Sequence, residues 1–179
     1  MHNNKLEVNP DKREVIPVTS KHNQTSLYIP FSVDLSGTSI HLSSVVRNLG
    51  VTIDQNLSFQ QHVSRTCQIC CLELRRNNST HYYLSQDALE TPISASVLSR
   101  IDYYNFLLAG CAKQLSHKLQ KVQNNAVRLI CDCRTPKLDH ISPVLQWFPV
   151  EQRIKYQLFL LAFTSELWFE RERERRLVV

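Results

Sequence analysis

Glycine is scarce in this sequence, with only three among 179 residues. Loops that bind nucleotide phosphates need glycines, because a residue without a Cβ lets the backbone approach the phosphate closely. The chain contains neither a GxGxxG nor a GxxxxGK[ST] pattern, and it also lacks HExxH and GxSxG. These absences argue against a glycine-rich nucleotide loop, a zinc peptidase and a serine hydrolase with a nucleophile elbow.

Long apolar runs are also missing. No run approaches the roughly 20 residues that a membrane helix requires, and the mean hydropathy is -0.27. The N-terminal stretch MHNNKLEVNPDKREV has no apolar core of the kind found in secretory signals. We therefore expect an intracellular protein without a membrane partner, in a reducing compartment that keeps its six cysteines as free thiols.

Positive charge is in small excess and is unevenly distributed. The formal net charge is +5 and the pI is near 9.0. Most of the excess lies in residues 115–149, where two acidic residues accompany five basic ones: Lys118, Lys121, Arg128, Arg134 and Lys137. A mildly basic chain is compatible with a nucleic-acid partner, although it does not require one.

The first 56 residues have the character of short strands. Three β-rich segments are separated by prolines and Gly37, and a fourth follows: 13–18, 26–35, 38–46 and 48–54. We predict three or four short strands paired as hairpins.

From residue 57 the apolar spacing becomes helical. Ser58 is the predicted N-cap of a first helix, whose apolar stripe is Phe59, Val63, Cys67, Cys70 and Leu74. A second helix is expected to start after Ser85 and to stop at Gly110, with Pro92 either kinking it or delaying its start.

Two more helices are predicted after Gly110. One follows Ser116, with the apolar stripe Leu115, Leu119, Val122, Ala126 and Leu129. Another starts near Pro149 and carries Ile154, Leu158, Leu161 and Phe163. The charged run at 170–176 either extends this last helix or frays.

Several blocks of the sequence, taken in order, resemble one family. They are RNLGVTIDQNLSFQQHV (47–63), SRIDYYNFLLAG (99–110), LQKVQNNAVRLI (119–130) and DHISPVLQWFPVEQRIKYQLFLLAF (139–163). The family is the reverse transcriptase of non-LTR, LINE-type retrotransposons of the jockey-like branch. LEVNPDKREV (6–15) resembles the segment after the catalytic palm aspartates, where Lys12 matches a lysine and Arg13 replaces a threonine.

The resemblance implies an α+β chain with short N-terminal β-hairpins followed by a mostly helical, thumb-like bundle. Residues 1–56 would form the end of the palm and the primer grip, residues 57–169 the thumb-like region, and residues 170–179 an unrelated charged tail. Leu49 and Gly50 would lie at the turn of the primer-grip hairpin, close to the primer backbone. An ordinary strand with a bulge at Gly50 is the alternative.

Three further candidates for nucleic-acid binding are Lys118, Lys121 and Arg128, which line one side of the predicted third helix together with Asn125. They could follow a phosphate backbone, or they could form an ordinary solvated helix face. The resemblance favours nucleic acid. It also implies that Lys12 could give a proton to pyrophosphate in a complete enzyme.

Cysteine spacing raises the question of a zinc site. Cys67, Cys70 and Cys71 are close in sequence, as are Cys131 and Cys133, and His62 and His81 could contribute. No pair of CxxC motifs and no CxxC with a following HxxxH is present. Because Cys67 and Cys70 lie on a predicted apolar stripe, we interpret them as small hydrophobic residues and predict no metal ligands.

Polymerases of this family hold two Mg²⁺ ions with paired aspartates. The seven aspartates of this chain include no adjacent pair: Asp11, Asp34, Asp54, Asp87, Asp102, Asp132 and Asp139. We therefore expect a C-terminal fragment without fingers and palm, with no catalytic residue or cofactor of its own and no polymerase activity by itself. Magnesium would belong to the full-length family enzyme.

The expected partners are an RNA/DNA template-primer, bound weakly at most, and the missing fingers and palm. The alternative is a helical protein-interaction module, kept by a host or left as a relic, with no role in nucleic-acid binding. Binding to an RNA–DNA hybrid that weakens with salt would favour the first interpretation.

Overall fold

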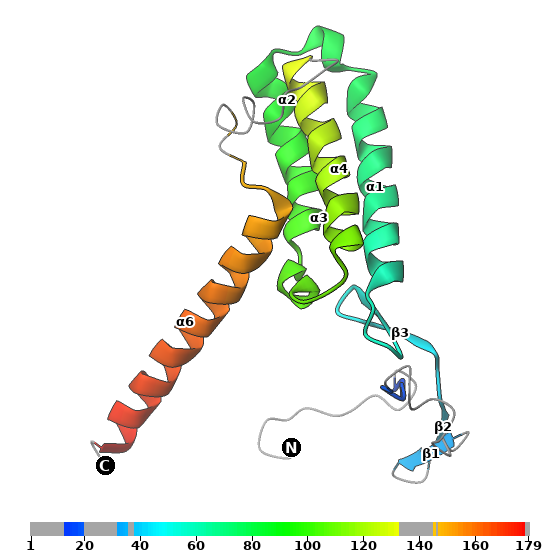
Figure 1. Ribbon diagram of the computed structural model, residues 1–179, viewed down its shortest axis with the longest axis vertical. Helices are drawn as coiled ribbons and strands as arrows, with labels where there is room; N and C mark the ends of the chain where they lie inside the picture. Colours follow the sequence, from blue (N-terminus) through cyan, green and yellow to red (C-terminus); the bar gives the residue numbers. More distant parts are fainter. Residues whose placement is uncertain (1–12, 20–31, 36–37, 133–144, 146, 178–179) are drawn as a thin grey trace. The chain divides into compact units, whose positions relative to one another are not determined.

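The computed structural model describes residues 13–19, 32–35, 38–132, 145 and 147–177. The chain divides into two compact units, residues 1–62 and 63–179. The first contains short antiparallel strands and the second is helical, so the predicted α+β class is confirmed. Figure 1 shows both.

Two hairpins form the described part of the N-terminal unit. Strand β1 (Ser32–Leu35) pairs with β2 (Thr38–His41), and β3 (Val45–Asn48) pairs with β4 (Val51–Asp54). A single strand was expected over residues 38–46. The structure has two strands there, because β2 pairs with β1 whereas β3 pairs with β4.

The segment 13–18 was expected to be a strand, but it makes only one isolated bridge. Val15 is bridged to Leu42, and the Ser43 N–H donates to the Val15 carbonyl at 2.9 Å. Pro17, which has no N–H, limits how far such a ladder can extend.

Leu49 and Gly50 form the two-residue turn between β3 and β4. Their φ angles are 46° and 84°, both in the left-handed region. Consecutive left-handed residues are what a tight hairpin needs to match the twist of its strands, and glycine at the second position adopts this conformation without strain. The predicted hairpin turn is confirmed, and the bulge alternative is wrong.

Asp54 organises the passage from β4 into the first helix. Its Oδ1 accepts from the backbone N–H of Asn56 and Ser58 at 3.0 and 3.1 Å, and its Oδ2 accepts from the Ser58 hydroxyl and the Phe59 N–H at 2.9 and 3.0 Å. Ser58 was the predicted cap, yet its Oγ receives only a long 3.4 Å contact from the Gln60 N–H. Asp54 therefore accepts four hydrogen bonds from the turn that precedes α1.

Helix α1 (Gln60–Asn78) follows the predicted apolar stripe, since Val63, Cys70 and Leu74 are buried. A short 3₁₀ turn, η3 (His81–Tyr83), connects it to the next helix.

The second predicted helix contains a π-helical turn and ends early. Helix α2 (Gln86–Ile93) starts at Ser85, whose side chain accepts from the Ala88 N–H. A π-helical turn η4 (Ser94–Leu98) follows Pro92, which cannot donate a backbone hydrogen bond. Helix α3 (Ser99–Asp102) then ends, eight residues before the predicted stop at Gly110.

The chain leaves the helix at Tyr103, which is extended, and Tyr104 follows in the left-handed region with φ 53°. The 3₁₀ turn η5 (Asn105–Leu108) and Gly110 (φ 83°) complete a connection to α4. The expected continuous helix up to Gly110 is therefore wrong.

Helix α4 (Lys113–Cys131) is amphipathic and lies at the centre of the helical unit (Figure 1). It begins three residues before the predicted start at Ser116. Its buried residues are Leu115, Leu119, Val122, Gln123, Ala126, Val127 and Ile130. Leu129, assigned to the stripe by spacing, is only half-buried, since Val127 and Ile130 face the core instead.

Helix α6 (Val150–Leu177) includes the charged run, which extends the helix. Of its described side chains only Val150 and Ile154 are buried, so the predicted stripe through Leu158, Leu161 and Phe163 is wrong. No helix among the described residues is long and apolar enough to span a membrane.

Candidate nucleic-acid interface

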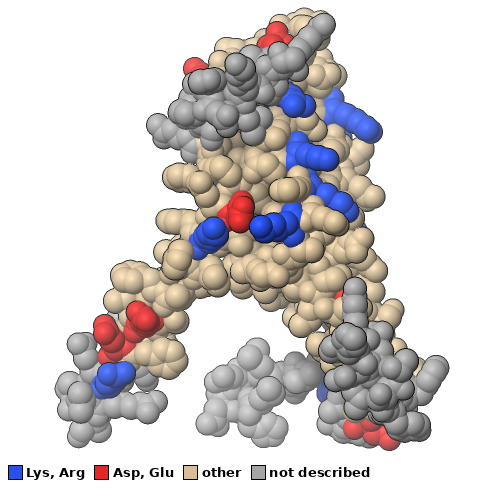
Figure 2. All heavy atoms as spheres, viewed as in Figure 1, with Lys and Arg blue, Asp and Glu red and all other residues tan. Residues whose placement is uncertain are grey.

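The outer face of α4 is basic. The helix contains no acidic residue, and Lys118, Lys121, Asn125 and Arg128 are all exposed. Spacings of three and four residues place them on one side of an α-helix. Figure 2 shows Lys and Arg atoms in a row along the helical unit, over the region where Figure 1 draws α4 and α1. The structure therefore brings Lys118, Lys121 and Arg128 onto one surface, which we name the α4 basic face.

Helix α1 lies beside this surface. A shallow hollow between the two helices is lined by Cys71, Leu74, Arg75 and Asn78 of α1 and by Asn125 and Leu129 of α4. Arg75 adds a cation to the same side of the unit. The hollow thus combines a guanidinium with two side-chain amides, groups that bind phosphate and sugar oxygens well.

Lys118 also lies close enough to α1 to act on Cys67. Burial and the neighbouring Cys71 raise the pKa of the Cys67 thiol, and the positive charge of Lys118 opposes that rise. Lys118 is therefore near enough to α1 for its charge to act there, in agreement with the hollow that the second part of α4 shares with α1.

A second polar hollow continues from the first. Arg128 donates to the Asn125 Oδ1 at 3.3 Å, and the His81 ring lies 3.8 Å from the Asp132 carboxylate. Asn78, His81, Asn125, Arg128 and Asp132 all contribute to its lining. Asp132 ends the row of cations, because its carboxylate repels phosphate at this end.

The other predicted site residues lie elsewhere. Lys12 is outside the described residues, and Leu49 and Gly50 belong to the N-terminal unit. Arg75 and Asn78 were not identified from sequence. The available signal was weak: two arginines in the last turn of a predicted helix, with no indication of which one faces α4.

The cysteines of α1 do not gather around a metal position. Cys70 is fully buried, and burial together with Cys67 raises the pKa of its thiol to about 12. Across the described segments no three His, Cys, Asp or Glu side chains form a group that could hold a metal ion. Cys133, Asp139 and His140 lie outside these segments. The described residues therefore do not fit the two-magnesium site that the resemblance implies for a complete polymerase.

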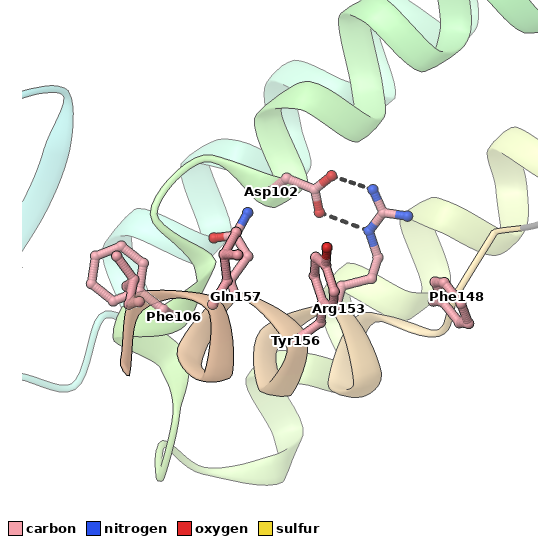
Figure 3. Close-up of a pocket in the computed structure, with 8 residues that line it drawn as sticks. Asp102, Phe106, Phe148, Arg153, Tyr156 and Gln157 are labelled. Atoms are coloured by element: carbon pink, nitrogen blue, oxygen red, sulfur yellow. Dashed lines mark hydrogen bonds and ion pairs between the residues drawn. The ribbon is translucent and has the colours of Figure 1, made fainter. Parts of the chain in front are cut away.

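A separate pocket lies where α6 meets the connection after α3 (Figure 3). Arg153 donates through Nε to the Asp102 Oδ1 at 2.7 Å and through Nη2 to Oδ2, and Asn105 Nδ2 donates to the same carboxylate at 3.2 Å. The pocket, of about 450 Å³, is otherwise mostly apolar, and its lining is Asp102, Phe106, Phe148, Arg153, Tyr156, Gln157, Leu160 and Leu161. We call it the Arg153 pocket.

Comparison with known proteins gives one match. Over 134 residues the chain is 26% identical to a protein of Drosophila melanogaster described as a probable RNA-directed DNA polymerase from transposon BS. The match covers 72% of this chain but only 14% of that polymerase. No protein-family model and no solved structure matches the chain. The similarity supports a relation to the RNA-directed DNA polymerases of transposable elements.

Proposed function

We propose that this chain corresponds to the C-terminal part of a non-LTR retrotransposon reverse transcriptase, comprising the end of the palm, the primer grip and the thumb. Two observations support this: the similarity to a stretch of a transposon polymerase, and the ordered sequence blocks. In this proposal Lys12 lies in the end of the palm, after the position of the family's catalytic aspartates. Leu49 and Gly50 form the primer-grip turn, and the helical unit is the thumb.

The proposed biochemical role is to bind a template-primer duplex through its backbone. The observation that carries the proposal is the α4 basic face: a helix without acidic residues that aligns three cations beside Arg75. Contacts of this kind are independent of base sequence, and each neutralised phosphate releases counterions. We propose further that the chain does not add nucleotides alone, since its aspartates include no adjacent pair.

A salt titration with matched variants tests the binding role. The probe is a fluorescent RNA–DNA hybrid, and the affinity of the whole chain is measured by anisotropy between about 50 and 200 mM salt, a range over which phosphate contacts lose most of their strength. Lys121→Ala and Arg128→Ala should each weaken binding and lower the slope of log K against log salt by about one.

Lys155→Ala is the matched control. Lys155 is an exposed lysine of α6, 3.9 Å from Glu151 and outside the α4 basic face. It should leave both affinity and slope unchanged. Equal effects of all three substitutions, or binding that does not respond to salt, would contradict the proposed interface.

A protein-interaction module is the second candidate function. It is favoured by the apolar side chains that α6 exposes from Tyr156 to Phe169. Monomeric proteins rarely expose an apolar patch larger than a few hundred Å² unless it binds something. This candidate predicts association that high salt does not weaken.

A further inference from the structure

One side of α6 is apolar, exposed and free of charge. Between residues 156 and 169 the only charged residue is Glu166. At 100° per residue, Glu166 lies on the same side of the helix as Lys155 and Phe159. The opposite side carries Tyr156, Leu160, Leu161, Thr164, Leu167 and Trp168, all of them exposed. We call these six residues the uncharged face of α6.

The uncharged face continues into the Arg153 pocket. Tyr156, Leu160 and Leu161 line that pocket, and Phe106 and Phe148 extend its apolar wall (Figure 3). Depletion of charge and enrichment of aromatic residues are the compositional marks of an interface core. The surface thus combines a row of exposed apolar side chains along α6 with a cavity that can receive a side chain.

Two pairs of residues on this face are equally spaced about the level of residue 162 along the helix. An antiparallel copy related by a twofold axis at that level places Trp168 of one chain opposite Tyr156 of the other, and Thr164 opposite Leu160. The same patch then serves both subunits, as an isologous dimer requires. We propose that the chain forms a symmetric dimer in which the uncharged faces of two antiparallel α6 helices pair and each Trp168 enters the other copy's Arg153 pocket.

The exposed area comes close to what such a contact buries. Tyr156, Trp168 and Phe148 each expose 59–66% of their surface. With aromatic side chains of 150–250 Å², these three alone contribute roughly 300–400 Å² per copy. The three leucines of the face and the pocket wall add to this, approaching the roughly 800 Å² that each partner buries in a standard interface. In the pocket, the Arg153 guanidinium can also stack on the indole.

Sedimentation of the whole chain tests the dimer. Between about 1 and 100 µM we expect a monomer–dimer equilibrium, in keeping with an interface at the small end of the specific range. The association should persist in high salt, since it does not depend on the proposed nucleic-acid binding. A chain that stays monomeric over this whole range would overturn the proposal. The uncharged face would then be expected to contact a different polypeptide.

Two adjacent substitutions test the geometry. Leu160 and Phe159 are 47% and 70% exposed but lie on different faces of α6. Leu160→Glu should weaken dimerisation at least about 100-fold, because each copy would bury an unpaired carboxylate against Thr164 of the other. Phe159→Glu should leave it unchanged. Equal helix content by circular dichroism shows that both variants fold, and an equal loss of dimer in both would contradict the proposed pairing.

Tryptophan emission reports on the pocket. In a Trp147→Phe variant the remaining tryptophan is Trp168, which is exposed in the single chain. Its emission should shift to shorter wavelength as the dimer forms, because the indole leaves water. A dimer in which Trp168 keeps the emission of a solvated indole would show that another surface makes the contact.

Discussion

Helices α4 and α6 differ in how they use apolar residues. The 19 residues of α4 place theirs at intervals of three and four, and seven side chains are buried. In α6, with 28 residues, the run LFLLAF puts apolar side chains next to one another, and burial ends at Ile154. A regular interval gives one stripe that a single layer of neighbours can cover, whereas a contiguous run surrounds the helix. Spacing rather than apolar content therefore decides which helix packs within the chain.

The first turn of α6 is nevertheless held firmly. The Gln120 Oε1 accepts from the Val150 N–H at 2.8 Å, and Gln123 Nε2 donates to the Phe148 carbonyl at 2.9 Å. The Arg153–Asp102 pair adds a bidentate contact. Polar groups of α4 and α3 thus fix the start of α6, and the uncovered part begins one turn later.

The largest predicted effect is the difference in stability between truncating an apolar side chain of α4 and truncating one of α6. Leu119 of α4 is 2% exposed and Leu158 of α6 is 45% exposed. Leu119→Ala should lower the free energy of unfolding by about 2–5 kcal/mol through lost burial and a cavity, and Leu158→Ala by less than about 1 kcal/mol. Urea denaturation at low protein concentration measures both. Similar losses would mean that α6 is covered in the monomer.

The next effect concerns the anchor of α6. The side chains of Arg153 and Asp102 are 19% and 27% exposed. Arg153→Met keeps much of the apolar stem but leaves the carboxylate without its partner, and should cost about 1–3 kcal/mol, between the values for surface and buried pairs. Lys155→Met is the control, because the Lys155–Glu151 pair is exposed at 3.9 Å and should contribute less than about 1 kcal/mol. Equal losses in both variants would show that the Arg153–Asp102 pair does not anchor the helix.

The sequence predicted the fold well where neighbours in sequence decide it. The Leu49–Gly50 turn was implied by the family resemblance and the helix start after Ser85 by the residues that follow it, and both features depend on nearby residues. The end of α3 was not predicted. YYNFLLAG contains ordinary helix-compatible residues, but Asp102 is bound by Arg153, 51 residues away, and the chain turns at Tyr104. A contact at that distance leaves no local pattern.

The same distinction applies to the candidate site. Lys118, Lys121 and Arg128 share one helix, so their spacing was enough to place them on one face. Arg75 and Asn78 join them only because α1 packs against α4 in a particular rotation. Apolar periodicity predicts which side of a helix is buried, but it does not predict which other helix lies next to its polar side.

A smaller effect is expected at Asp54, where local contacts alone determine the structure. Burial raises the pKa of this carboxyl, but hydrogen bonds from Ser58, Asn56 and Phe59 outweigh it, so the net pKa lies below the ordinary value. The contribution to stability is therefore complete above the unfolded pKa, near 4, and is lost as the pH falls through the lower folded value. Asp54→Asn keeps one acceptor oxygen and should cost about 1 kcal/mol at neutral pH.

The pH dependence provides the check on Asp54. Urea midpoints of the parent chain and of Asp54→Asn should differ at pH 7 and converge as the pH approaches the folded pKa, because protonation removes the same acceptor. A difference that stays constant down to low pH would mean that the substitution acts through packing and not through the carboxylate.

The smallest predicted change in stability is for a substitution on the exposed side of α4. Lys121 is exposed on the basic face, whereas Val122, the next residue, is buried. Lys121→Ala should change the free energy of unfolding by no more than about 0.5 kcal/mol, since it removes no buried contact and alanine favours helix. Paired urea curves of this variant and the parent chain make the measurement. If stability is unchanged while hybrid binding weakens, Lys121 serves recognition; a clear loss of stability would show instead that the lysine stabilises the helix, and the binding result would have to be attributed to misfolding.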